Sequence, residues 1–274
     1  MKKVIIPFDG SHFSEGAFSM ALNINNLQSL MLTGIFLPQV DYARFMFLPT
    51  AFMSPFFMPI RETFDEAEVE KNIESFINRC KENNIEYKVH KDLLDAAIPQ
   101  LTKETRFADL MIIGSEVFYK DIESNDSFEY LKDTLQHAEC PVLIVPEKAN
   151  FPGSIVLTYD GSASSVYAIK QFANMFPELC GLKTILVYAG DDKHAIPDRE
   201  NIDELAGRHF SDLTIDEIVS DHSSDFFNNW LNDHKNPLVV NGSFGRAGAV
   251  QLFNQKAISR IISEHQTPLF ISHK

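Results

Sequence analysis

The sequence predicts an α/β protein with two tandem Rossmann-like domains, and three observations carry this prediction. Apolar stretches typical of strands alternate along the chain with stretches whose apolar residues recur at helical spacing. Three sequence signatures occur twice, in the same order. Asp or Gly stands at the carboxyl end of several apolar strands, and ligands bind at these strand ends in such folds. We therefore expect each domain to hold a five-stranded, mostly parallel sheet with helices on both faces.

The repeat is defined by these three signatures. The first is an apolar strand, Asp-Gly-Ser and a helix; the second is an apolar strand ending in Gly-Ser; the third is an amphipathic helix, a turn with proline and an apolar strand. Their copies lie at Val4–Leu22 and Ile155–Phe172, at Ala108–Ser115 and Asn236–Ser243, and at Leu131–Glu147 and Ile258–Lys274. A period near half the chain predicts two copies of one domain rather than a solenoid of short repeats.

The domains are expected at residues 1–148 and 152–274, joined by the linker Phe151–Ser154. In the first half, the remaining strands are expected at Ser29–Leu37 and Glu86–His90, and helices at Arg61–Asn83 and Asp95–Arg106. In the second half, strands are expected at Leu182–Ala189 and Leu213–Val219, and helices at Asp198–Phe210 and Asp221–Asp233. Right-handed crossovers then bring the carboxyl ends of the strands to one edge of each sheet.

Composition narrows the class of partner. The chain has 24 basic and 38 acidic side chains, a formal charge of −14, and both halves are acidic. Phosphate neutralisation needs basic surface, so we expect no nucleic-acid partner. Three cysteines without a Cys-x-x-Cys motif favour a reducing cytoplasm. The apolar run before Asp9 is too short for a signal peptide, so this segment is expected to be a strand.

An aromatic segment, Phe45–Ile60, stands apart from the repeat. It holds five phenylalanines and three methionines, interrupted by Pro49, Pro55 and Pro59. These prolines break any regular helix, so membrane insertion is not expected. The segment either covers its own domain or the other repeat, or it forms a contact with a second subunit or an apolar ligand. Packing or a homo-oligomer contact is the favoured interpretation.

The strand-Asp-Gly-Ser opening, the loop GSFGRAG at 242–248 and the closing helix with TPLFIS resemble the universal stress protein family, here present twice. The resemblance covers nearly the whole chain. In family members that bind ATP, it implies a Gly-x-x-Gly loop, nine further residues and then Gly-Ser or Gly-Thr. Glycines let main-chain N–H groups approach phosphates, and the helix that follows adds positive potential. The resemblance also implies pairing of the last strands, Pro141–Pro146 and Pro268–Ser272, into a pseudo-dimer.

In the second repeat, the expected ligand is ATP or another adenine nucleotide, and no metal is expected. Asp160 matches the acidic residue that meets the adenosine, and Gly242, Ser243 and Gly245 match the loop. Gln255 and Lys256 stand where the second Gly-Ser or Gly-Thr belongs, and Lys256 with Arg246 could compensate by charge. The candidate binding residues are therefore Asp160, Gly242, Ser243, Gly245, Arg246, Gln255 and Lys256. The alternative is that the loop is only an inherited turn.

In the first repeat, the same loop reads GSEVFYKDIESNDSFEYLKD at 114–133 and has no glycine after Gly114. Its acidic residues would repel a triphosphate, so no ATP is expected there. No motif in the chain names a reaction. The expected function is therefore a non-catalytic, ligand-binding or signalling universal stress protein. The alternative is a nucleotide-hydrolysing or nucleotidyl-transferring enzyme that uses Asp160 and the loop from Gly242 to Lys256.

Overall fold

The structure is a computed structural model of the 274-residue chain. It describes residues 1–8, 12–37, 66–91, 97–115, 134–189 and 196–218, residues 227–242 except 228 and 232, and residues 260–272 except 263 and 265.

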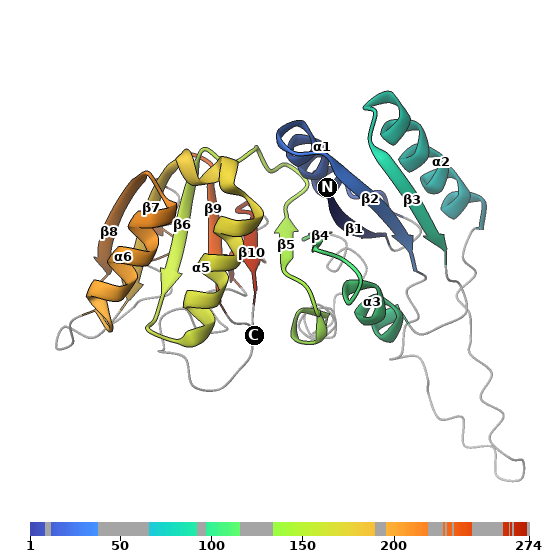
Figure 1. Cartoon of the computed structure of the whole chain (residues 1–274). Coiled ribbons are helices and arrows are strands. Elements are labelled where there is room, and N and C mark those ends of the chain that lie inside the picture. Colours follow the sequence, from blue (N-terminus) through green and yellow to red (C-terminus); the bar gives the residue numbers. More distant parts are fainter. Residues whose placement is uncertain are drawn as a thin grey trace, which may run out of the picture.

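The described strands form one ten-stranded sheet, in the order β3-β2-β1-β4-β5-β10-β9-β6-β7-β8 (Figure 1). The first half contributes β1 (Lys2–Phe8), β2 (Leu30–Phe36), β3 (Glu86–Lys91), β4 (Leu110–Gly114) and β5 (Val142–Val145). The second half contributes β6 (Ser154–Tyr159), β7 (Lys183–Ala189), β8 (Asp212–Ile218), β9 (Pro237–Asn241) and β10 (Leu269–Ile271). Within each half every pairing is parallel, and both halves have the same strand order. The predicted fold class is therefore confirmed.

The described helices overlap the expected ones, although α2 is described only from Glu66 and the expected start at Arg61 lies outside the described residues. The helices are α1 (Glu15–Leu27), α2 (Glu66–Glu82), α3 (Ala97–Thr105), α5 (Ala163–Met175), α6 (Arg199–His209) and the 3₁₀ helix η2 (Pro177–Gly181). The sequence did not predict η2, in which Pro177 begins a tight turn directly after α5. The expected helix at Asp221–Asp233 lies partly outside the described residues, which include helical positions at 227 and 229–231.

Apolar side chains cover both faces of the sheet because successive residues of a strand point to opposite sides. Ile6 belongs to a cluster with residues of α1, α2, α5 and α6, whereas its neighbour Ile5 belongs to a second cluster on the other face. That second cluster includes Leu101 of α3. It also includes Leu135, Phe227 and Ile261, which belong to short helical stretches at 134–137, around 227–231 and at 260–262. Each cluster contains residues of both halves. The two halves therefore share their apolar layers.

The halves meet where β5 pairs antiparallel with β10, near the centre of Figure 1. The register places Leu269 opposite Ile144, Phe270 opposite Leu143 and Ile271 opposite Val142. The predicted pairing of the two last strands is thus present within one chain. Because the seam is antiparallel, the carboxyl ends of the strands in the two halves lie at opposite edges of the sheet.

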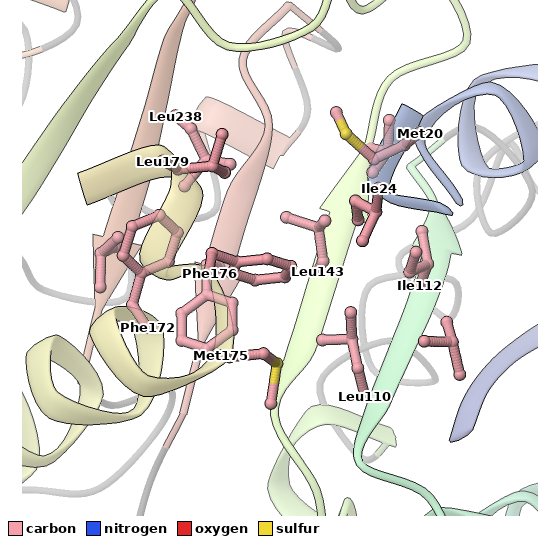
Figure 2. Close-up of a cluster of buried hydrophobic side chains, with 14 of the residues drawn as sticks. Met20, Ile24, Leu110, Ile112, Leu143, Phe172, Met175, Phe176, Leu179 and Leu238 are labelled. Carbon is pink, nitrogen blue, oxygen red and sulfur yellow. The ribbon is translucent and has the colours of Figure 1, made fainter. Parts of the chain in front are cut away.

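Aromatic and aliphatic side chains pack across this seam. Figure 2 shows Met175 and Phe176, from the end of α5, lying toward Leu143 of β5. The Phe176 ring also lies 6.0 Å from that of Phe270, with an edge-to-face interplanar angle of 81°. Phe176, Leu143 and Phe270 are all at most 2% exposed. Burial of each such side chain contributes about 1.5–3 kcal/mol, so this packing adds to the strand pairing in holding the halves together.

The connection between the halves begins after Val145, where β5 ends, and continues to Gly153. Ser154, the last residue of the expected linker, is already the first residue of β6. The domain boundaries at 148 and 152 remain predictions. The segment Phe45–Ile60 lies outside the described residues. In the part of the chain that is described, no helix has the length and apolar character needed to cross a membrane.

Candidate functional site

The strand order reverses once in each half, and this point defines the candidate site. In the second half, β6 lies between β7 and β9, so the chain moves to one side through β7 and β8 and to the other through β9 and β10. Ligands of open parallel sheets bind at the carboxyl ends of the two strands that flank such a reversal. Asp160 follows β6 and Gly242 follows β9. The structure therefore brings these two predicted residues to one edge.

A buried polar contact joins the ends of β6 and β9. The hydroxyl oxygen of Thr158 lies 2.9 Å from both the carbonyl oxygen of Val240 and Oδ1 of Asn241. Thr158 and Asn241 are 2% and 4% exposed, so these polar groups are screened from water. Such contacts strengthen in a low dielectric, and they fix the spacing of the two strand ends. Neither residue was singled out from the sequence, although a polar pair within two apolar strands was a visible signal.

Asp160 shapes the beginning of α5. Its Oδ1 accepts a hydrogen bond of 2.9 Å from the backbone N–H of Ser162. Ser162 in turn caps the helix, since its hydroxyl accepts from the N–H of Ser165 at 3.1 Å. The Asp-Gly-Ser signature therefore turns the chain from strand into helix here. This arrangement directs the amino end of α5, and its positive potential, toward the edge that holds Asp160.

Gly242 allows β9 and α5 to approach closely. A Cβ atom at this position would lie 2.3 Å from the backbone nitrogen of Ser165 and 2.4 Å from the carbonyl oxygen of Ser164. No side chain fits there without moving the helix. The first glycine of the loop is therefore required to seat α5 against the end of β9, a structural role that the sequence interpretation did not include.

Tyr159 and Gly161 connect this edge to the segment before α6. The Tyr159 hydroxyl donates a 2.8 Å hydrogen bond to the carbonyl oxygen of Pro197. Burial raises the pKa of Tyr159, and the nearby carboxylates of Asp198 and Asp160 raise it further, so the phenol stays protonated as a donor. Gly161 has φ of +78°, and a Cβ atom there would lie 2.9 Å from Pro197. Residues 196–198 are thereby fixed beside Asp160.

The first half carries phenylalanines at the strand ends where the second half carries tyrosines. The register that pairs Tyr159 with Tyr188 in the second half pairs Phe8 with Phe36 in the first. The Phe8 ring stacks on Phe36, with centroids 4.8 Å apart, and on Phe13, with centroids 4.9 Å apart. Phenylalanines offer no hydrogen bonds to a nucleoside, whereas the tyrosines carry hydroxyl groups. The two halves therefore differ in chemistry at equivalent positions.

The other predicted site residues, Ser243, Gly245, Arg246, Gln255 and Lys256, lie outside the described residues, as does the acidic loop of the first repeat. Among the side chains that are described, no three His, Cys, Asp or Glu residues gather as a metal site.

Comparisons with known proteins bear on the fold. No family model and no curated protein matches the chain. Among solved structures, a universal stress protein from Archaeoglobus fulgidus DSM 4304 aligns with a TM-score of 0.65 and 13% identity, covering 99% of this chain and 98% of that one. The alignment with a protein of the universal stress protein family from Burkholderia pseudomallei covers 53% of this chain and 95% of that one, at 17% identity and a TM-score of 0.34. The chain therefore has the tandem fold of a universal stress protein.

Proposed function

We propose that the chain is a non-catalytic, ligand-binding universal stress protein of the cytoplasm, and that the second repeat binds ATP or a related adenine nucleotide. The observation that carries this proposal is the difference between the two strand reversals. In the second, a tyrosine ends β6 and another lies opposite it on β7, and Thr158 makes a buried polar contact with Asn241, whereas the stacked phenylalanines Phe8 and Phe36 occupy the tyrosine positions in the first.

The described residues fit the adenosine part of such a ligand. The Asp160 carboxylate at the end of β6 would accept hydrogen bonds from ribose hydroxyls. The amino end of α5 would favour the anionic part of the nucleotide, because the helix dipole and N–H groups point toward it. Among the described residues, no carboxylate accepts a hydrogen bond from the backbone N–H of Ser164 in α5. This donor is therefore compatible with a ligand. Arg246 and Lys256 would supply charge to the phosphates.

The direct test is calorimetric titration with ATP, where we expect one ATP per chain. Gly245→Glu should abolish binding, because a carboxylate side chain blocks close backbone approach to phosphate. Replacing Arg246 and Lys256 by alanine should weaken binding and flatten its dependence on salt. Two equal sites, or unchanged affinity in the double variant, would contradict the assignment.

A turnover assay with Mg²⁺ tests the enzymatic alternative on the same preparations. A non-catalytic module returns the nucleotide intact, with no phosphate or nucleotidyl product above the buffer rate. Sustained product formation that Asp160→Asn removes would overturn the non-catalytic assignment.

A further inference from the structure

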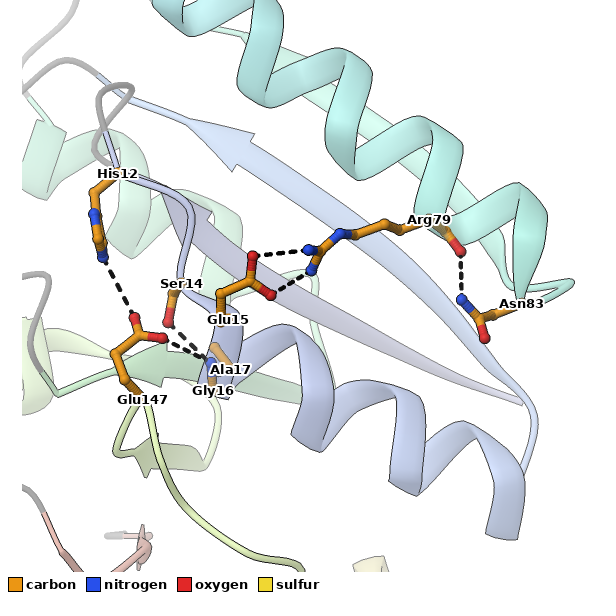
Figure 3. Close-up of polar contacts among 8 residues, drawn as sticks. All are labelled: His12, Ser14, Glu15, Gly16, Ala17, Arg79, Asn83 and Glu147. Atoms are coloured by element: carbon orange, nitrogen blue, oxygen red, sulfur yellow. Dashed lines mark hydrogen bonds and ion pairs between the residues drawn. The ribbon is translucent and has the colours of Figure 1, made fainter.

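In the first repeat, a side-chain carboxylate of the protein itself contacts the amino end of α1. The backbone N–H of Gly16, the second residue of α1, donates a 3.0 Å hydrogen bond to Oε2 of Glu147 (Figure 3). The other carboxylate oxygen lies 3.5 Å from Nε2 of His12. Glu147 follows β5 and is 131 residues away from Gly16 in the sequence.

The backbone around this contact is closely fitted. A Cβ atom on Gly16 would lie 2.2 Å from the carbonyl oxygen of Pro146 and 2.8 Å from Cα of Glu147. Only glycine allows the end of β5 to lie against the helix in this way. The next N–H of the helix, that of Ala17, donates to the Ser14 hydroxyl at 3.4 Å. Glu147 and Ser14 therefore satisfy two neighbouring donors of the helix terminus.

The second repeat differs at both partners of this contact. The caps Ser14 and Ser162 align the helices, so Ser164 is the counterpart of Gly16. Within the described residues, no carboxylate accepts a hydrogen bond from the Ser164 N–H. The third signature aligns Glu147 with Lys274, so the charge at the equivalent sequence position is reversed.

We infer that Glu147 takes the place of a ligand anion in the first repeat and thereby restricts anionic ligands to the second. This specificity role rests on the proposed nucleotide function. A carboxylate held at the helix terminus satisfies the donor that a phosphate would use, and its charge repels a phosphate nearby. Glu147 belongs to the described structure and explains the restriction without the acidic loop at 116–126.

The test compares ATP titration of the full-length wild type, Glu147→Gln, Glu147→Asp and Glu15→Gln. Glu15 is the matched control, because it lies at the same helix end but pairs with Arg79, with Oε1 2.8 Å from Nη2 (Figure 3). We expect Glu147→Gln to bind one more ATP per chain than the wild type. Glu147→Asp and Glu15→Gln should keep the wild-type stoichiometry. Equal stoichiometry in the wild type and Glu147→Gln would overturn the inference.

The two proposals fail in different ways. A wild type that binds no ATP refutes the proposed function, yet Glu147→Gln gaining one site would still support the role of Glu147. Amide chemical shifts give a second measurement that does not depend on the stability of the variant. On addition of ATP to the wild type, the Gly16 amide should stay fixed while the Ser164 amide shifts. A saturable shift of Gly16 in the wild type would overturn the inference.

Discussion

Three glycines show how single residues set the geometry of the two halves. Gly16 lets the end of β5 reach α1, Gly242 lets the end of β9 reach α5, and Gly161 supplies a positive φ beside Pro197. The sequence predicted Gly242 as part of a phosphate loop. It could not show that the space beside Gly242 is filled by α5, because that contact joins residues far apart in the chain.

Replacing Gly242 by alanine tests this close approach. The added Cβ must displace α5 from the end of β9, and such overpacking costs about 1–3 kcal/mol. Gly207, within α6, is the matched control because a Cβ there meets nothing within 4 Å. Gly207→Ala should stabilise the protein by about 0.5–1 kcal/mol, since alanine favours helix. Urea unfolding measures both, and a Gly242→Ala variant as stable as the wild type would contradict the geometry.

The three cysteines predict an alkaline limit to stability. Burial raises the pKa of Cys80 and Cys140 from 9.0 to about 12, and that of Cys180 to about 11. The folded state therefore retains thiol protons that the unfolded state loses, and this contribution is present below pH 9.0 and lost as the pH rises toward 12. Melting temperature should fall over this window. At pH 8, a thiol reagent should label these cysteines only in denaturant, and rapid native labelling would contradict their burial.

At the scale of elements, strands were predictable and helix beginnings were less so. Strands five or six residues long, apolar throughout and followed by Gly or Asp, can be placed from the sequence alone. Both halves carry Asp-Gly-Ser, yet the caps differ: Ser162 of this signature caps α5, whereas Ser14, three residues after the signature, caps α1. Phe13, directly before the cap Ser14, stacks on Phe8 at the end of β1, whereas the second repeat has Gly161 directly before its cap Ser162.

Helix α5 ends at the seam, where the first half contacts its last carbonyl group. Lys2 Nζ and Gln28 Nε2 both donate to the carbonyl oxygen of Met175, the latter at 3.0 Å. The Lys2 ammonium also lies 5.7 Å from the centre of the Phe176 ring. Burial lowers the pKa of Lys2, and the carboxylates of Glu178 and Asp109 oppose this shift. A cation at a helix carboxyl end is favourable, so Lys2 links the two halves through the end of α5.

Lys2→Ala should therefore destabilise the protein by about 1.5–3 kcal/mol, the usual contribution of a hydrogen bond that involves a charged group. Lys2→Met keeps the apolar stem over Phe176 and should recover part of that loss. Lys3→Met is the control on the neighbouring residue. Thermal unfolding of the three variants separates the contributions, and equal melting temperatures for Lys2→Ala and Lys3→Met would show that the contact contributes nothing.

At the scale of the whole molecule, the sequence predicted the duplication, the parallel sheets and the pairing of the last strands. The pairing was implied by the resemblance to universal stress proteins, and two apolar end strands that would otherwise be exposed agree with it. The sequence did not predict the contacts of Glu147 with Gly16 or of Lys2 with Met175, because each joins residues that are far apart in the chain. The candidate site was predictable only as strand ends, and its polar partners came from the structure.

The seam is the element on which this arrangement depends, and Ile144→Lys tests it. Ile144 is 1% exposed and pairs with Leu269, so a lysine there would bury an unpaired charge between the halves. We expect a loss of at least about 3 kcal/mol, or outright unfolding. Analytical ultracentrifugation and NMR relaxation then report whether the halves still tumble as one body. Wild-type stability with independently tumbling halves would refute the arrangement.

Because the seam is antiparallel, the strand ends of the two halves face opposite sides of the molecule. The strands of the second half end at one edge of the sheet, where Asp160 and Gly242 lie. The strands of the first half end at the opposite edge, where Leu37 lies. Leu37 is the last described residue before the segment that contains Phe45–Ile60. A partner that contacted the chain where β2 ends would therefore approach from the side of the sheet opposite the proposed nucleotide site. The proposed ligand and such a partner would not compete for the same edge of the sheet.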